Sequence, residues 1–228
     1  MSSQLTFYGH ACFGLQTAQY RLLFDPYLSG NPAAAIGAEQ VEAEFILVSH
    51  GHGDHLGDAV KIARRCDATV IAVAEIATWL RGQGVKTHAQ HLGGSFRHPF
   101  GLCKFTLALH GSSLPDGSYG GNPAGFLLTL HDGKKIYFAG DTGLFGDMRL
   151  IGDEGIEVAI LPIGDNYTMG PADALRAVEF LRPRIVIPMH YNTFPLIQQD
   201  VQAWKQSVEA GNDAQVIILQ PGESYSIQ

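Results

Sequence analysis

The feature that most constrains this sequence is a cluster of metal-binding side chains within six consecutive residues. The cluster reads His50, Gly51, His52, Gly53, Asp54 and His55. Its two glycines allow tight backbone turns and are expected to relieve crowding among the neighbouring side chains. The apolar segment 44–49 before it has strand character, and 56–65 after it permits a helix. The cluster is therefore predicted on a connecting loop at the carboxyl end of a strand, where catalytic groups usually sit. Imidazole and carboxylate ligands together favour zinc, iron or manganese.

Three later predicted strands each end in a further candidate ligand. His110 follows the apolar segment 105–109, Asp141 follows 135–140, and His190 follows 184–189. One six-residue loop cannot complete two metal sites, so ligands from other strand ends are needed. The candidate metal ligands are His50, His52, Asp54, His55, His110, Asp141 and His190.

Segments along nearly the whole chain resemble one enzyme family. The HxHxDH loop, the later His110, the Gly-Asp-Thr strand end at Asp141 and the final His190 stand in the order found in metallo-β-lactamase superfamily hydrolases. The sequence resembles still more closely the bacterial metal-dependent hydrolase family related to the UlaG-type lactonases. The matching segments are 8–10, 23–26, 49–57, 110–113, 139–142, 161–166, 168–171 and 188–195. The resemblance implies an α/β fold, a four-layer αββα sandwich, which we expect to form a single domain over residues 1–228.

The resemblance also implies two divalent metal ions, zinc or manganese, with iron as a further option. It places His50, His52 and His110 on one ion, places Asp54, His55 and His190 on the other, and makes Asp141 the bridge between them. Asp54 and His10 are the catalytic candidates. His10 would lie near the centre and contact substrate or transfer a proton, unless it is a structural histidine.

The expected activity is hydrolysis of a small ester, lactone or phosphoester by a metal-bridging hydroxide, because two nearby ions acidify a shared water. No Ser/His/Asp triad is then required. Two alternatives stay open: a catalytically silent metal-binding or sensor protein, and a phosphodiesterase or nuclease of the same superfamily.

Several polar residues near the ligands have supporting roles as hypotheses. Asp25, which ends the apolar segment 22–24, is a candidate to orient a ligand imidazole. The candidates for pocket walls, which could equally cap turns, are Asp165, Asn166, Asn192 and Thr193. The histidines interpreted as solvated or packed side chains are His88, His91, His98 and His131.

The composition argues against some binding partners and some cellular locations. A net charge of −7 with only 15 Lys and Arg argues against nucleic acid as a partner, and no segment approaches the about 20 apolar residues of a membrane span. The expected partner is a small-molecule substrate. Three cysteines without a CxxC motif, and no secretory signal at the start, favour a cytoplasmic protein with reduced thiols. A homo-oligomer is expected because the related lactonases associate.

A coarse twofold organisation is also expected. Strands precede helices in each half of the chain, and helices are predicted at 172–181 and 198–210. The halves share no evident sequence identity, so the repeat is an expectation about architecture.

Overall fold

The computed structural model describes residues 3–228 and contains two seven-stranded β-sheets. The first sheet has the spatial order β14 (Ser224–Ile227), β1 (Ser3–Gly9), β2 (Cys12–Gln16), β3 (Arg21–Phe24), β4 (Phe45–Leu47), β5 (Thr69–Val73) and β6 (Lys86–Gln90). The second has the order β13 (Gln215–Val216), β12 (Ile185–Met189), β11 (Val158–Pro162), β10 (Lys135–Phe138), β9 (Ala124–Thr129), β8 (Gly101–Leu107) and β7 (Ser95–His98).

The two sheets share one pattern of strand pairing. In the first sheet the three pairs from β14 to β3 are antiparallel, and the three from β3 to β6 are parallel. In the second sheet the pairs from β7 to β10 are antiparallel, and those from β10 to β13 are parallel. The expected architectural repeat is therefore present, although the edge strand β14 of the first sheet comes from the other end of the chain.

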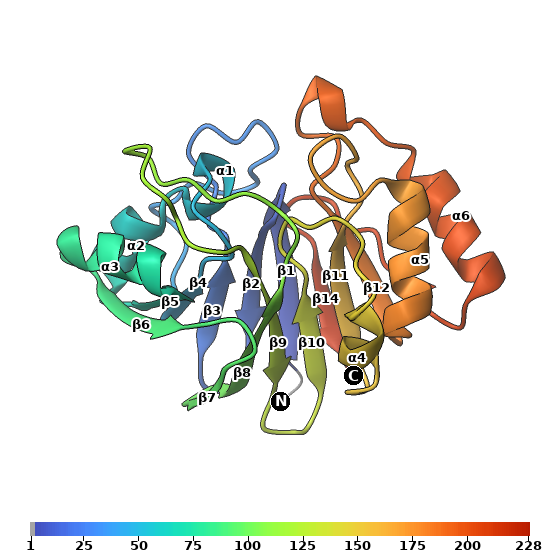
Figure 1. The fold of residues 1–228 in the computed structure, drawn as a ribbon, viewed down its shortest axis with the longest axis horizontal. Coiled ribbons are helices and arrows are strands. Elements are labelled where there is room, and N and C mark those ends of the chain that lie inside the picture. The colour runs from blue at the N-terminus through green and yellow to red at the C-terminus, as the bar shows by residue number, and fades with distance from the viewer. Residues whose placement is uncertain (1–2) are drawn as a thin grey trace.

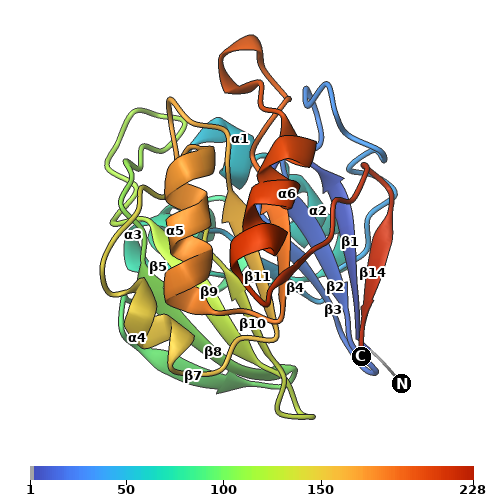
Figure 2. The same ribbon diagram turned by 90° about the vertical axis from the view of Figure 1, so that its right-hand side faces the viewer.

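Helices cover the outer face of each sheet and complete four layers (Figure 1, Figure 2). The first sheet carries α2 (Ala59–Cys66) and α3 (Ala74–Gly82). The second carries α4 (Met148–Gly152), α5 (Pro171–Leu181) and α6 (Val201–Gly211). In α5, proline occupies the first turn, and the buried face consists of Ala174, Ala177, Val178 and Leu181 at helical spacing. The predicted αββα sandwich is confirmed.

Aromatic side chains fill the space between the sheets. Phe24 of β3 stacks on Phe138 of β10 with ring centroids 5.1 Å apart, and Phe126 of β9 lies 6.0 Å from Phe138. All three are fully buried. Contacts of this kind join the two sheets directly. Their loss would destabilise the fold, since truncating a core Phe to Ala typically costs about 3–5 kcal/mol of stability.

Several predicted boundaries differ from the structure. The strands before His50 and Asp141 end at Leu47 and Phe138, two residues earlier than predicted, and the helix predicted at 198–210 begins at Val201. The strand before His110 ends at Leu107 rather than at residue 109, so that ligand follows the strand after a short extension. Asp54 and His55 do not lie on a loop, because they belong to the short helix α1 (Gly53–Leu56). The amides of His55 and Leu56 both donate to the carbonyl of His52, which starts this turn. An acidic residue in a first helical turn is favourable.

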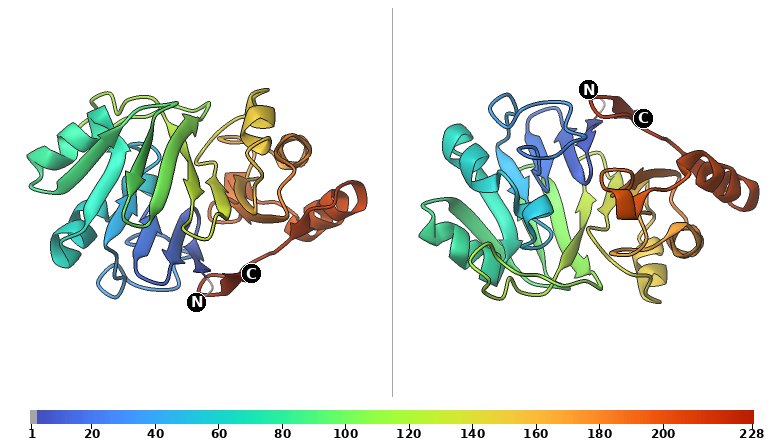
Figure 3. Two further views of the ribbon diagram at one scale, coloured as in Figure 1. Left: turned by 90° about the horizontal axis from the view of Figure 1, so that it is seen from below. Right: turned by 90° about the horizontal axis from the view of Figure 1, so that it is seen from above.

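Strand direction brings the loops that carry the candidate ligands to one end of the molecule. β1 runs in the same direction as β3 because both pair antiparallel with β2, and β8 runs with β10 because both pair antiparallel with β9. The carboxyl ends of β1, β3, β4, β8, β10, β11 and β12 consequently meet at one edge, at the top of Figure 1 and facing the viewer in the right panel of Figure 3. We call it the ligand edge. Among residues 3–228, no helix is both long enough and apolar enough to cross a membrane.

Candidate metal centre

Three histidines form a first group of converging ligand atoms at the ligand edge. His50 and His52 follow β4, and His110 follows β8, so the group draws on both sheets. Their available ring nitrogens lie within 4.8 Å of one another. Nε2 of His50 is 3.0 Å from Nδ1 of His52. Burial lowers the pKa values of His50 and His110, which favours the neutral imidazole that binds metals.

A second group lies beside the first. Asp54 and His55 of α1 converge with His190, which follows β12, and with His10, which follows β1. The nearest carboxylate oxygen of Asp54 is 4.0 Å from Nε2 of His55 and 3.9 Å from Nε2 of His190. The carboxylate of Asp54 is about one third exposed, so this group is open to solvent on the Asp54 side.

Asp141 lies between the two groups. Its Oδ2 atom is 3.0 Å from Nε2 of His190, 3.2 Å from Nε2 of His55 and 3.6 Å from Nε2 of His110. The first two histidines belong to the second group and the third belongs to the first group. All seven predicted ligands therefore meet at one place, and Asp141 has the location expected of a bridging carboxylate.

Four buried polar atoms of this cluster are left without hydrogen-bond partners. They are Nε2 of His55, Oδ1 of Asp141, and Nδ1 and Nε2 of His190. An unpaired buried polar group costs about 1–3 kcal/mol, so a fold seldom leaves several side by side. Bound cations would supply the missing partners. The donor set of imidazole nitrogens and carboxylate oxygens, without thiolate, fits zinc, manganese or iron.

A buried carboxylate orients one of the ligand rings, as expected for Asp25. Its Oδ2 atom accepts a hydrogen bond at 2.7 Å from Nδ1 of His55. That bond leaves Nε2 of His55 free to face the centre. Ser49 holds the same carboxylate through its amide and its hydroxyl, at 2.7 and 2.6 Å. Ser49 is not among the predicted site residues, although its position directly before His50 is a signal that could have indicated it.

His10 lies behind Asp54 and not at the surface of the centre. Its side chain has no exposed area, and Nε2 is 3.2 Å from Oδ2 of Asp54. Burial lowers the pKa of His10 to about 4, with the neighbouring Asp54 opposing the shift, so the ring is neutral at pH 7. The burial of His10 and its contact with Asp54 favour a supporting role over direct contact with a substrate.

Backbone strain is concentrated at the ligand edge. Non-glycine residues with positive φ here are His10 (61°), Asp25 (42°), Asp165 (62°), Asn166 (53°), His190 (55°) and Asn192 (58°). Elsewhere in residues 3–228, only Asp67 and Arg182 share this conformation. Such residues cluster at functional sites, where the surrounding structure holds them in place.

The two glycines of the HxHxDH loop have different roles. A Cβ atom on Gly51 would lie 2.8 Å from the carbonyl oxygen of Ser113, whereas a Cβ on Gly53 would meet nothing within 4 Å. The amide of Gly51 also donates to the hydroxyl of Ser112 at 3.0 Å. The expectation that both glycines relieve crowding is correct for Gly51 and wrong for Gly53, because residue 53 starts α1 and faces open space.

The four candidate wall residues divide into two kinds. Thr193 supports the centre through His10, since its Oγ1 is 2.9 Å from Nδ1 of that ring. Asp165 and Asn192 stabilise their own turns, with Asp165 accepting from the amide of Asn166 and Asn192 accepting from the amide of Gln199.

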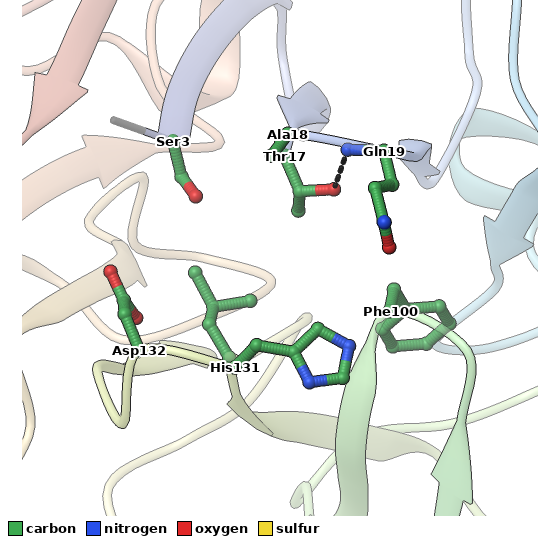
Figure 4. A pocket seen from close by; sticks show the side chains of 8 residues that line it. Ser3, Thr17, Ala18, Gln19, Phe100, His131 and Asp132 are labelled. Atoms are coloured by element: carbon green, nitrogen blue, oxygen red, sulfur yellow. Dashed lines mark hydrogen bonds between the residues drawn. The ribbon is translucent and has the colours of Figure 1, made fainter. Parts of the chain in front are cut away.

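The four remaining histidines lie outside both ligand groups. His98 is buried, pairs with Gln90 and stacks on Phe100, so its packing role is confirmed. A pocket of about 420 Å³ opens at the end opposite the ligand edge (Figure 4). It is lined by the β2–β3 and β9–β10 turns together with Ser3 and Phe100, and it contains none of the candidate ligands.

Comparison with known proteins extends the likeness to the whole chain. Residues 20–191 match the model of the beta-lactamase superfamily domain. A protein of Desulforamulus reducens named UPF0173 metal-dependent hydrolase is 54% identical over 231 residues, covering 98% of this chain and 100% of that protein. Igni18, a metallo hydrolase of the archaeon Ignicoccus hospitalis, aligns with a TM-score of 0.92 at 36% identity, covering 100% of this chain and 99% of that chain. The metallo-beta-lactamase fold protein YhfI of Bacillus subtilis aligns with a TM-score of 0.75 at 14% identity, covering 99% of each chain, which supports the fold alone.

Proposed function

The chain belongs to the beta-lactamase superfamily and is a metal-dependent hydrolase, and on that premise we propose that it uses two divalent ions to cleave a small ester, lactone or phosphoester. The hydrolase assignment rests on relatives that are named metal-dependent hydrolases and whose sequences are about half identical to this chain. The number of ions and the substrate class are our inference from the site.

One observation carries the dinuclear proposal. Oδ2 of Asp141 lies within 3.6 Å of histidines from both ligand groups, while Oδ1 of Asp141 and Nε2 of His55 are buried without partners. A carboxylate with two oxygens can contact two cations and offset their mutual repulsion. A single ion would leave one group of nitrogens without a partner.

Two divalent ions in this position would lower the pKa of a shared water toward about 7 and polarise the oxygen of the scissile bond. The chain supplies the geometry for that chemistry. Asp25 fixes the ring of His55, and His10 fixes the carboxylate of Asp54. Asp54 is also the most exposed member of the second group, so it faces the space that a substrate would enter.

A silent metal-binding protein is the main alternative from another class. The seven ligand side chains meet, and the Asp54 side is open to solvent. These two features favour a catalytic protein over one that stores or senses metal. A nuclease of the same superfamily would need a cationic surface for phosphates.

The test combines metal analysis with a substrate screen. We expect up to two ions per chain and hydrolysis of at least one compound from a panel of lactones, carboxylic esters and phosphodiesters. His110→Ala should lose both metal and activity, whereas His131→Ala, an exposed histidine outside the centre, should keep both. A fully loaded protein that hydrolyses nothing in the panel would favour the silent alternative.

A further inference from the structure

The loops of the ligand edge contain no cationic side chain. None of the 15 Lys and Arg residues of the chain lies in the segments 25–44, 48–58, 108–123, 139–147, 163–170 or 190–200. The chain runs from Lys104 to Lys134 without one. Lys61, in the first half of α2, already has an acidic partner, since its Nζ is 3.9 Å from a carboxylate oxygen of Glu39. Enzymes that bind phosphate or carboxylate groups usually present Arg, Lys or a helix N-terminus to them.

The helix N-termini at this edge already have acidic neighbours. Gly170 caps α5, and a Cβ on it would lie 2.9 Å from the carboxyl carbon of Asp165. Glu75 lies in the first turn of α3. Carboxylates in or beside the first turn of a helix offset its positive end and so weaken its attraction for an anion. Asp116 and Asp200 add negative charge to the same set of loops.

Large apolar side chains are exposed on the same loops. Leu109 is 50% exposed, Tyr167 51% and Leu196 66%. Leu109 directly precedes the ligand His110, and its amide donates to Thr142, the residue after Asp141. Leu196 lies two residues after Phe194, whose ring centroid is 5.3 Å from that of His10. Exposed apolar side chains on the loops that carry the ligands indicate a surface that binds something apolar.

We propose that the substrate is uncharged away from the bond that is cleaved and carries an apolar group that packs on Leu109, Tyr167 and Leu196. This proposal rests on the proposed hydrolase function and narrows it to neutral esters or lactones. A phosphate or carboxylate elsewhere on the substrate would find no cationic side chain on these loops, which carry the acidic residues Asp116, Asp165 and Asp200.

A matched pair of esters tests the proposal through turnover. 4-Nitrophenyl butanoate and 4-nitrophenyl hemisuccinate release the same 4-nitrophenol and have acyl chains of equal length, but the second chain ends in a carboxylate. Because that carboxylate also expels 4-nitrophenol without enzyme, by forming the cyclic anhydride, each rate is corrected for the enzyme-free reaction. We expect kcat/KM for the butanoate to be larger by about tenfold or more, which corresponds to about 1.4 kcal/mol. Equal values, or a preference for the hemisuccinate, would overturn the proposal and leave the hydrolase assignment intact.

A matched pair of metal-binding ligands tests it without turnover. Hexanohydroxamic acid and adipic monohydroxamic acid present the same chelating group, and their chains end in a methyl and a carboxylate respectively. Calorimetric titration of the metal-loaded protein should give a Kd for the first that is lower by about tenfold. The expected ratio of the two Kd values does not depend on ester hydrolysis. If the ratio is found but no ester is hydrolysed, the proposed hydrolytic function fails and the proposal about the substrate's charge does not. Equal affinities would overturn the substrate proposal.

A variant with a matched control locates the effect. Leu196→Lys places a cation at the ligand edge, and Leu150→Lys places one on α4, where the leucine is equally exposed at 66%. Metal content should be unchanged in both. Leu196→Lys should raise kcat/KM for the hemisuccinate and lower the butanoate preference about threefold or more, while Leu150→Lys should not. The same shift in both variants would show that overall charge sets the preference, which would contradict a role for the loops.

Discussion

His10 is joined to Asp54 by a hydrogen bond in which the ring must be the donor. The carboxylate of Asp54 can only accept, so Nε2 of His10 carries the proton across the 3.2 Å separation. Nδ1 of the neutral ring then accepts from the hydroxyl of Thr193 at 2.9 Å. The alternative acceptor for that hydroxyl, the carbonyl of Tyr191, is farther away at 3.4 Å. A short chain from Thr193 through His10 therefore fixes the carboxylate of Asp54.

Replacing His10 should weaken this support without removing a metal ligand. Asparagine tolerates the positive φ of this position, so His10→Asn should keep the local backbone. We expect this variant to bind both ions at saturating metal. Metal affinity or turnover should fall by about 10–100-fold, the usual effect of losing a partner of a metal ligand. His190→Asn should instead lose metal and activity together. Metal titration checks both, and loss of the ions from His10→Asn at saturating metal would make His10 a ligand.

Asp141→Asn should sharply lower metal content. The amide keeps the shape of the side chain but lacks the charge that offsets two cations, and Oδ2 of Asp141 lies next to both ligand groups. Elemental analysis should show one ion or fewer per chain. Asp165→Asn, an exposed residue on a neighbouring loop, is the control and should keep the wild-type content. Unchanged stoichiometry in Asp141→Asn would reject the bridging assignment.

Alanine substitutions at Gly51 and Gly53 should have opposite effects. Gly51→Ala forces a Cβ against the carbonyl of Ser113 at 2.8 Å, so we expect a loss of about 1–3 kcal/mol in the free energy of unfolding and weaker metal binding by His50 and His52. Gly53→Ala meets open space in the first turn of α1, and alanine favours a helix. It should be neutral or slightly stabilising. Denaturant unfolding of both variants decides the point, and equal destabilisation would show that the whole loop is strained.

His98 should make stability fall in acid. Burial, together with the neighbouring His88, lowers the pKa of His98 to about 4, below the usual imidazole value. The unfolded chain therefore binds a proton as the pH drops through about 6.5 while the folded chain does not, so stability is full above that pH and is lost down to about pH 4. His98→Asn should remove on the order of 1–2 kcal/mol of this dependence, measured by urea unfolding between pH 4 and 7. His131→Asn, which replaces an exposed histidine, should behave like wild type, and parallel pH curves for His98→Asn and wild type would contradict the prediction.

The sandwich could be expected from the resemblance to a known family, whereas the meeting of seven His and Asp side chains could be expected because it depends on local patterns. Each ligand follows an apolar segment, and parallel strands place their carboxyl ends together. The expected orienting role of Asp25 rests on the same logic, since β3 and β4 are parallel neighbours.

Other features depend on distant parts of the chain or on segments too short for periodicity. Helix α1 has four residues, so no repeat in the sequence reveals that Asp54 and His55 are helical. The burial of His10 beneath Asp54 requires the positive φ of His10 and the approach of Thr193 from the far end of the chain. β14 pairs with β1 across almost the full sequence, and no local signal indicates that partner.

The amide of His190 donates to the carbonyl of His10 at 2.8 Å, and this bond connects a loop of the first sheet to a loop of the second. Ions held by His55 and His190 would strengthen that connection in the manner of a cross-link. A cross-link between residues so far apart in sequence restricts the unfolded chain and so raises the unfolding temperature. Removing the metal ions with a chelator should thus do more than abolish activity. It should let the two sheets separate first at the ligand edge, and amides there should exchange with deuterium before those of the aromatic core around Phe138.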